Sequence, residues 1–542
     1  MIWFVRDFDL LALLLRALAF SLEALAFGGV FFLLIAARPA RLPVEQQAHL
    51  RRAISWFALA LALTQIALLA TTSAELMGSA GLGWGDLASE PFFLAGGLFA
   101  GASLLLFFLL RFTARLVPPM VAITVALAAS VALSHAASRL DHRPLVLILT
   151  AAHHLGMAAW IGALAFLLIA LRRTADPDIA RAMARRFSAM AVVSVVVLVL
   201  AGAGLAYFYA GSWQGMYGTS YGILLSAKIV LTALMLTLGT SNFFLLRRVE
   251  SEPKPLFRLR RFGEAELGLG FTVILAAASL TAQSPSVDES LQDTLTGHQV
   301  VQRMEWRWPG FHTPALAQLA PPTPLSVAVR EATYTGGSSS DANDRAWSEY
   351  NHHWAGLIVL AAGLLALVSR LPRLRRLRQL GQQWPLLFLG LSVFILMRAD
   401  PECWPLGPRP FWRSFTAPDV LEHRLFAVLI AAFAIFEWGV QRGWLCWPRA
   451  RFVFPVLCAA GGALLLTHTH ALGEGTDEVF AELSHTPMAI LGAVAGWSRW
   501  MELRLDGEPE SAESSRYRRW AAWLWPVCLI LVGLLLLDYR ES

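Results

Sequence analysis

Long apolar runs recur along almost the whole chain, and they restrict the fold more than any other feature. A helix that crosses the hydrocarbon core of a bilayer needs about 20 mostly apolar residues. Backbone polar groups in lipid must be satisfied within the segment, so such runs are expected to be helices. About fourteen runs approach this length, near 10–36, 53–77, 91–114, 117–138, 144–171, 187–211, 222–246, 263–282, 351–369, 384–398, 421–441, 451–470, 478–498 and 519–538. The sequence therefore predicts an all-α, polytopic integral membrane protein with the lipid bilayer as its surroundings.

The composition supports this fold class and restricts the partners. Of 542 residues, 56% are hydrophobic and 15% are charged, whereas soluble domains carry about 25% charged residues. The net charge of +6 is explained by orientation signals beside membrane helices, so we expect no nucleic-acid partner.

Basic residues alternate from one connection to the next. Excess Lys and Arg mark the cytoplasmic side of a membrane protein. The connections 79–90, 212–221 and 471–484 contain no Lys or Arg. Basic residues concentrate instead in 38–52, 111–115, 172–186, 247–261, 370–378, 442–451 and 499–519. This alternation places both termini outside, with eight helices in the front half and six in the back half.

A polar stretch separates the two halves. It contains "APPTP" and "TGGSSSD" and lacks a strong helix or strand pattern, which is typical of an ordered loop. We predict a domain over 1–285, an extracytoplasmic loop over 286–350 and a second membrane domain over 351–542.

The histidines lie almost entirely on the predicted outer side. Of thirteen, only His49 falls in a cytoplasmic connection. Imidazole binds copper, zinc and haem iron and titrates near neutral pH. The residue spacing alone leaves copper and haem as alternatives. We predict metal ligands in two groups, one in the front half and one at the outer rim of the back half: His135, His153 and His154, and His352, His353, His423, His468, His470 and His485.

Two further features of the sequence indicate a path for ions. Glu23 and Lys228 fall inside predicted spans, where ionisable side chains by default mark a functional route. His153 and Met157 are four residues apart and therefore share a helix face. An imidazole and a thioether on one face form a ligand pair that suits Cu(I).

Several motifs of the front half occur together in order. "SHAA" precedes "HHLGMAAWIGALAFL", and "RRF" and "GTSYG" follow before a span that contains a lysine. Together they resemble the copper resistance protein D family, closely over about 130–250 and loosely over 1–285. One departure is Ala163, which stands where that family usually has a second glycine. The matching positions are His153, Trp160, Gly162, Arg186, Phe187, Gly218, Thr219, Tyr221, Gly222 and Lys228.

The resemblance implies a copper-handling protein of the plasma membrane that moves copper inward. The sequence lacks a phosphate-cradling loop and any Ser, Cys or carboxylate catalytic constellation, so an enzyme is not expected, with membrane redox chemistry left open. We predict a bacterial inner-membrane protein that binds copper at periplasm-facing histidines and transports or stores it. The alternative is a b-type haem electron carrier with bis-His ligation. A periplasmic copper-binding protein is a further expected partner, and a scaffold that only assists such a protein remains a third possibility.

Overall fold

Helices account for all the regular secondary structure that is described. The computed structural model describes residues 8–248, 255–290, 293–319, 339–371, 375–416, 418–467, 476–506 and 512–540. In these ranges the one strand-like contact is an isolated bridge between Cys403 and Arg409. Twelve described helices are long and apolar enough to cross a membrane. The prediction of an all-α, polytopic membrane protein is confirmed.

The helices coincide with the predicted spans, with differences at their ends. The predicted span 117–138 holds α6 (Val117–Ala132), which has 16 residues, and the short α7 (His135–Ser138). The predicted span 421–441 lies within α20 (Pro418–Gln441). Helix α17 (Ser339–Val368) begins well before residue 351 and so includes residues expected in the loop. The predicted loop also contains the short helix α14 (Gly297–Met304).

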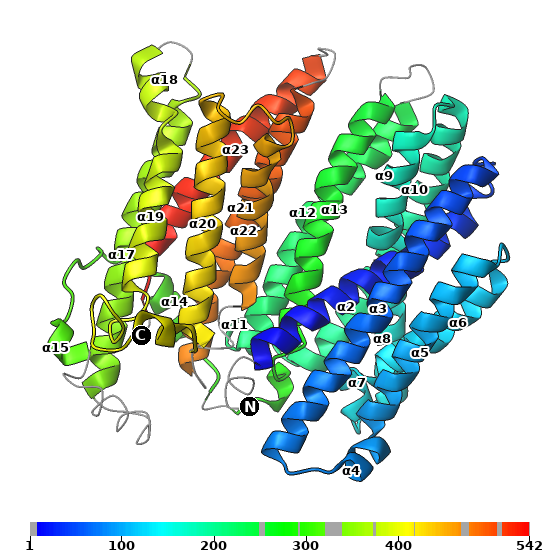
Figure 1. Ribbon diagram of the computed structural model, residues 1–542, viewed down its shortest axis with the longest axis horizontal. Helices are drawn as coiled ribbons and strands as arrows, with labels where there is room; N and C mark the ends of the chain where they lie inside the picture. The colour runs from blue at the N-terminus through cyan, green and yellow to red at the C-terminus, as the bar shows by residue number, and fades with distance from the viewer. Residues whose placement is uncertain are drawn as a thin grey trace. The chain divides into compact units, whose positions relative to one another are not determined.

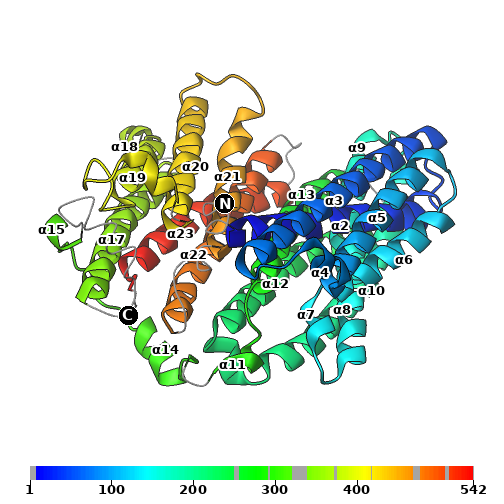
Figure 2. The same ribbon diagram turned by 60° about the horizontal axis from the view of Figure 1, so that its bottom comes forward.

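The chain folds into two compact units, each with its own set of packed helices (Figures 1 and 2). Among described residues, the first unit holds 8–216 and 228–289, and the second holds 217–227 and 290–540. The main helices of the first unit, besides α6, are α2 (Phe8–Phe31), α3 (Val44–Ser79), α5 (Pro91–Phe112), α8 (Arg143–Met157), α9 (Ala163–Arg173), α10 (Pro177–Ala210), most of α12 (Ser220–Arg248) and α13 (Pro255–Leu280).

Helix α2 crosses the π-helical segment η2 (Ala158–Gly162) at very short range. A Cβ atom added to Gly162 would lie 1.7 Å from the carbonyl oxygen of Ala24, and one added to Gly28 would lie 2.2 Å from that of Ala158. Only glycine lets the two backbones approach this closely, as in other small-residue crossings of membrane helices. The crossing fixes α2 against the segment that follows the two adjacent histidines of α8.

The second unit packs around an aromatic core. Its main helices are α17, α19 (Trp384–Arg398), α20, α21 (Val453–Leu464), α22 (Thr476–Leu505) and α23 (Ala512–Leu537). Trp384 and Trp525 are almost fully buried, and the centroids of their rings are 5.4 Å apart. Phe454 packs against both rings, and glycines let α17 and α23 approach closely.

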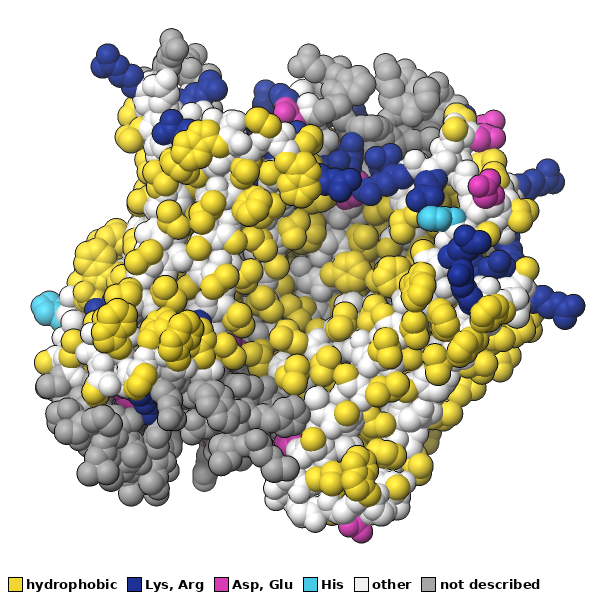
Figure 3. Space-filling model, viewed as in Figure 1, with side chains coloured by type: hydrophobic (Ala, Val, Ile, Leu, Met, Phe, Trp, Pro, Cys, Tyr) yellow, Lys and Arg dark blue, Asp and Glu magenta, His cyan; other side chains and the backbone are white. Residues whose placement is uncertain are grey.

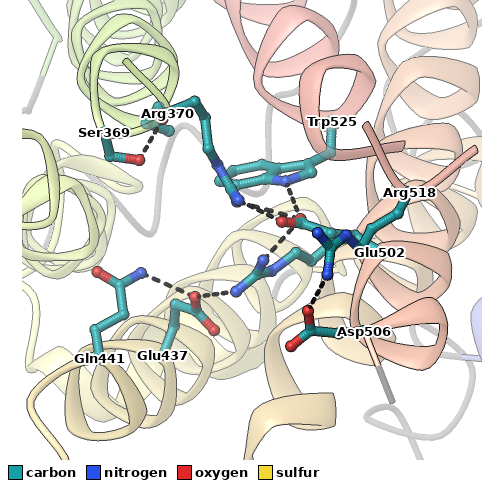
Figure 4. A network of polar contacts seen from close by, with 10 residues as sticks. Ser369, Arg370, Glu437, Gln441, Glu502, Asp506, Arg518 and Trp525 are labelled. Atoms are coloured by element: carbon teal, nitrogen blue, oxygen red, sulfur yellow. Dashed lines mark hydrogen bonds and ion pairs between the residues drawn. The ribbon is translucent and has the colours of Figure 1, made fainter. Parts of the chain in front are cut away.

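Buried ion pairs join the helices of this second unit at one end (Figure 4). Arg499 lies 3.1 Å from Glu437 and 2.7 Å from Glu502. Arg370 pairs with Glu502 from the end of α17, and Trp525 donates its indole N–H to the same carboxylate at 2.9 Å. Glu502 therefore accepts from both arginines and from the indole, while Glu437 provides a second carboxylate for Arg499.

Connections predicted on the same side of the membrane lie at the same end of the first unit. Arg172 pairs with Glu264 at 2.8 Å, and Gln46 accepts a hydrogen bond from Thr174. Lys and Arg side chains gather at this end, beside the start of α10 (Figure 3). The structure thus agrees with the charge alternation within the unit, and the orientation of that end toward the cytoplasm stays a prediction.

Candidate functional site

A buried carboxylate joins three helices in the interior of the first unit. Glu23 of α2 is 1% exposed. One oxygen lies 2.9 Å from Nδ1 of His154 on α8, and the other accepts a hydrogen bond from the hydroxyl of Ser130 on α6 at 3.0 Å. Because a carboxylate only accepts, this contact assigns the N–H of His154 to Nδ1. The remaining nitrogen, Nε2, carries the lone pair when the ring is neutral.

The adjacent histidine contacts a different charged group. Nε2 of His153 lies 3.4 Å from the Nζ atom of Lys228 on α12. A Cβ atom on Gly202 of α10 would lie 3.3 Å from the imidazole ring, so this glycine leaves space for it. An ammonium group beside Nε2 competes with a metal ion for the same lone pair. A metal could bind His153 through Nε2 only if Lys228 moved away.

The third front-half histidine lies on α7, beside the C-terminal end of α13. Nε2 of His135 is 2.9 Å from the carbonyl oxygen of Thr281, and Arg16 donates to that same oxygen at 2.8 Å. The three predicted front-half ligands thus contact three separate sets of partners, and a shared metal site among them stays a prediction.

In the second unit, two predicted ligands lie close together. The ring centroids of His352 and His485 are 6.0 Å apart, at 87° to one another. Nδ1 of each ring lies 2.8 Å from a backbone carbonyl one helical turn earlier, of Ser348 and Ala481 respectively. Tyr539 stacks on the His352 ring at 3.8 Å. Both rings are therefore held with Nδ1 as the N–H donor.

The other predicted ligands of the second unit are placed differently. His353 is buried, with Nδ1 2.7 Å from the carbonyl of Gly310 and Nε2 3.0 Å from that of Tyr539. His423 is half-buried on α20. His468 and His470 lie outside the described residues.

A basic side chain from the predicted loop contacts the residue that precedes His485. Arg303 of α14 donates to the hydroxyl of Ser484 at 2.7 Å and to the carbonyl of Arg540. Burial lowers the pKa of Arg303, and the nearby charge of Arg540 acts in the same direction.

A second buried carboxylate of the first unit was missed by the sequence analysis. Glu266 of α13 is 4% exposed. It accepts hydrogen bonds from the indole of Trp160 at 2.9 Å and from the amide of Asn242 at 3.0 Å. Its presence in the predicted span 263–282 was the available signal, because acidic residues are rare in membrane spans.

Within the described ranges, no three or more His, Cys, Asp or Glu side chains gather so that they could hold a metal ion. The described residues instead offer a pair of imidazoles in the second unit and buried ionisable groups in the first. These features define a polytopic α-helical membrane protein with ionisable side chains inside its spans.

Comparison with known proteins finds similarity to copper proteins of membranes. Residues 181–280 match the family model for copper resistance protein D. It is also 28% identical over 290 residues to "Copper transport protein CutJ" of Bacillus subtilis (strain 168). That match covers 49% of this chain and 51% of the relative, so the chain spans about half the length of the curated protein. No solved structure matches the chain.

The comparisons confirm the resemblance and support a copper-related membrane protein. The family match begins after the front-half histidines and includes Lys228, Asn242 and Glu266. The family match therefore does not include His135, His153 or His154.

Proposed function

We propose that the protein binds copper at the outer ends of its helices and carries it inward across a bacterial inner membrane. The match of residues 181–280 to the copper resistance protein D model supports copper as the metal, and the name of the relative supports transport. The outer positions of the histidines support entry of copper from the periplasmic side.

The pair of His352 and His485 carries this proposal. Histidines that bind metals usually donate the second ring N–H to a carbonyl or carboxylate, which fixes the tautomer. Both rings here hold Nδ1 against a backbone carbonyl, and so both have their lone pair on Nε2 when neutral. With centroids 6.0 Å apart, small side-chain rotations would let one ion lie about 2 Å from each Nε2.

The charged groups of the first unit support movement through the membrane. Glu23 and His154 form a buried pair between α2 and α8, and His153 and Lys228 form a second contact one residue away. Ionisable residues inside membrane helices commonly line ion routes. In our proposal copper passes this region, with His154 Nε2 as the candidate contact and Glu23 as the group that orients its ring.

The binding step is tested by metal analysis and absorption spectroscopy of the purified protein. The double variant His352→Ala and His485→Ala should bind less copper than the parent. His298→Ala, an exposed histidine of α14, is the matched control and should bind as much as the parent. Unchanged copper content in the double variant would contradict the proposed site, and a Soret band lost in that variant would favour the haem alternative.

The transport step is tested with the protein reconstituted into liposomes. Copper uptake by the parent should exceed that of empty liposomes, and His154→Ala should reduce it. Wild-type protein that binds copper but takes up none would favour storage over transport.

A further inference from the structure

Glu266 occupies an unusual position among the acidic residues of the first unit. Its two carboxylate oxygens accept from Trp160 and Asn242, which are both uncharged donors. Gly239 of α12 leaves room for it, since a Cβ atom there would lie 3.0 Å from the nearer oxygen. The carboxylate is thus enclosed by three segments of the fold, η2, α12 and α13.

No described basic side chain lies within ion-pair distance of Glu266. Glu264, two residues earlier, pairs with Arg172 at 2.8 Å and with Arg261 at 3.3 Å. The other charged or titratable groups on the surrounding helices contact different partners: Arg16 the carbonyl of Thr281, Glu23 the ring of His154, and Lys228 the ring of His153. The ionised form of Glu266 therefore has hydrogen bonds but no compensating charge.

The surrounding groups can satisfy both protonation states of this carboxyl. The ionised form accepts from the indole and the amide, as observed. The protonated form needs an acceptor for its O–H. Oδ1 of Asn242 is buried and makes no hydrogen bond, and a half-turn of the amide would bring it to that O–H, because the two ends of an amide differ only in hydrogen-bonding role.

The same geometry favours a proton over a metal ion. Hard cations such as Ca²⁺ and Mg²⁺ bind through several oxygen ligands. Here N–H groups point at both carboxylate oxygens and take the positions that a cation would need. A proton needs one oxygen and one acceptor, and both are present.

We propose that Glu266, with Asn242 and Trp160, is a proton-binding site inside the first unit, and that its protonation is coupled to copper movement. One proton binds to a carboxylate oxygen and is later released to water, so no bond is broken other than O–H. The coupling rests on the proposed transport function, whereas the proton site does not.

The proton site is tested by infrared difference spectroscopy of the full chain in lipid across a pH series. We expect a carbonyl band of a protonated carboxylic acid that disappears as the pH rises and is absent in Glu266→Gln. Glu264→Gln, which removes the neighbouring ion-paired carboxylate, is the matched control and should retain the band. A Glu266→Gln spectrum identical to the parent's would overturn the site.

A second variant leaves the carboxylate in place. Trp160→Phe keeps an aromatic ring but removes one donor to the ionised form. The midpoint of the band should then move to higher pH, by about one to two units, the value expected for one hydrogen bond to a charged group. An unmoved midpoint would show that Trp160 does not act on a titrating Glu266.

The coupling is tested by copper uptake into liposomes with and without an imposed pH gradient. Uptake by the parent should change several-fold with the gradient, and uptake by Glu266→Gln should not respond to it. If copper uptake by the parent is the same with and without the gradient, the coupling is overturned while the transport function stands. If the parent moves no copper, the transport function fails together with the coupling, and the infrared result alone decides the proton site.

Discussion

Gly162→Ala should weaken the fold of the first unit. The added Cβ would lie 1.7 Å from the carbonyl oxygen of Ala24, whereas ordinary contacts begin at 3.4 Å. The backbones of α2 and η2 would therefore have to separate by up to 1.7 Å, the difference between these two distances. Overpacking usually costs about 1–3 kcal/mol, and we expect the upper end because a backbone atom cannot rotate away. The higher helix propensity of alanine offsets about 1 kcal/mol of this cost, so the free energy of unfolding should fall by about 2 kcal/mol.

The matched control for this variant is Gly101→Ala in α5. An added Cβ there meets nothing within 4 Å, so the variant should be as stable as the parent or more stable by up to about 1 kcal/mol. Both free energies of unfolding can be measured by denaturation in mixed detergent micelles. If Gly162→Ala and Gly101→Ala unfold within about 0.5 kcal/mol of each other, the close crossing of α2 and η2 is not the reason for the glycine.

Three further predictions concern the second unit and the orientation of the chain. Glu502→Gln should cost about 3–5 kcal/mol of unfolding free energy, because it removes the carboxylate charge beside Arg370 and one of the two beside Arg499, whereas Asp506→Asn, in an exposed pair, should cost at most about 1 kcal/mol. Burial raises the pKa of the Cys403 thiol from 9.0 to about 12. At pH 8 it should be alkylated about a thousandfold more slowly than an ordinary cysteine, and the measured rate should rise tenfold per pH unit toward pH 12. In intact cells an impermeant thiol reagent should label Ala88→Cys but not Ala175→Cys, and the reverse pattern would overturn the orientation.

The spans could be predicted because the bilayer imposes length and apolarity on each helix separately. Their ends could not, because local hydrogen bonding and packing decide them. Helix α17 extends back to Ser339 through polar residues that give no apolar signal. Near the end of the predicted span 117–138, α6 stops at Ala132 and a separate short helix begins at His135.

The sequence alone could not identify the partners of the buried charges. Glu23 and Lys228 were expected to matter because charges are costly in a membrane. Their partners, His154 and His153, are 131 and 75 residues away along the chain, and helix packing alone brings them together. The same limit applies to His352 and His485, which were placed on one rim by topology but whose ring orientations depend on carbonyls of their own helices.

The Trp-x-Gly motif has two distinct physical roles in the first unit. Trp160 donates to Glu266, and Gly162 admits the backbone of α2 next to Ala24. Since Glu23 precedes Ala24, the crossing that needs the glycine also brings the carboxylate to His154. One short segment therefore supports the positions of both Glu23 and Glu266. It follows that Gly162→Ala should disturb the contact between Glu23 and His154 as well as stability, and that copper uptake should fall more in this variant than in Gly101→Ala at equal amounts of folded protein.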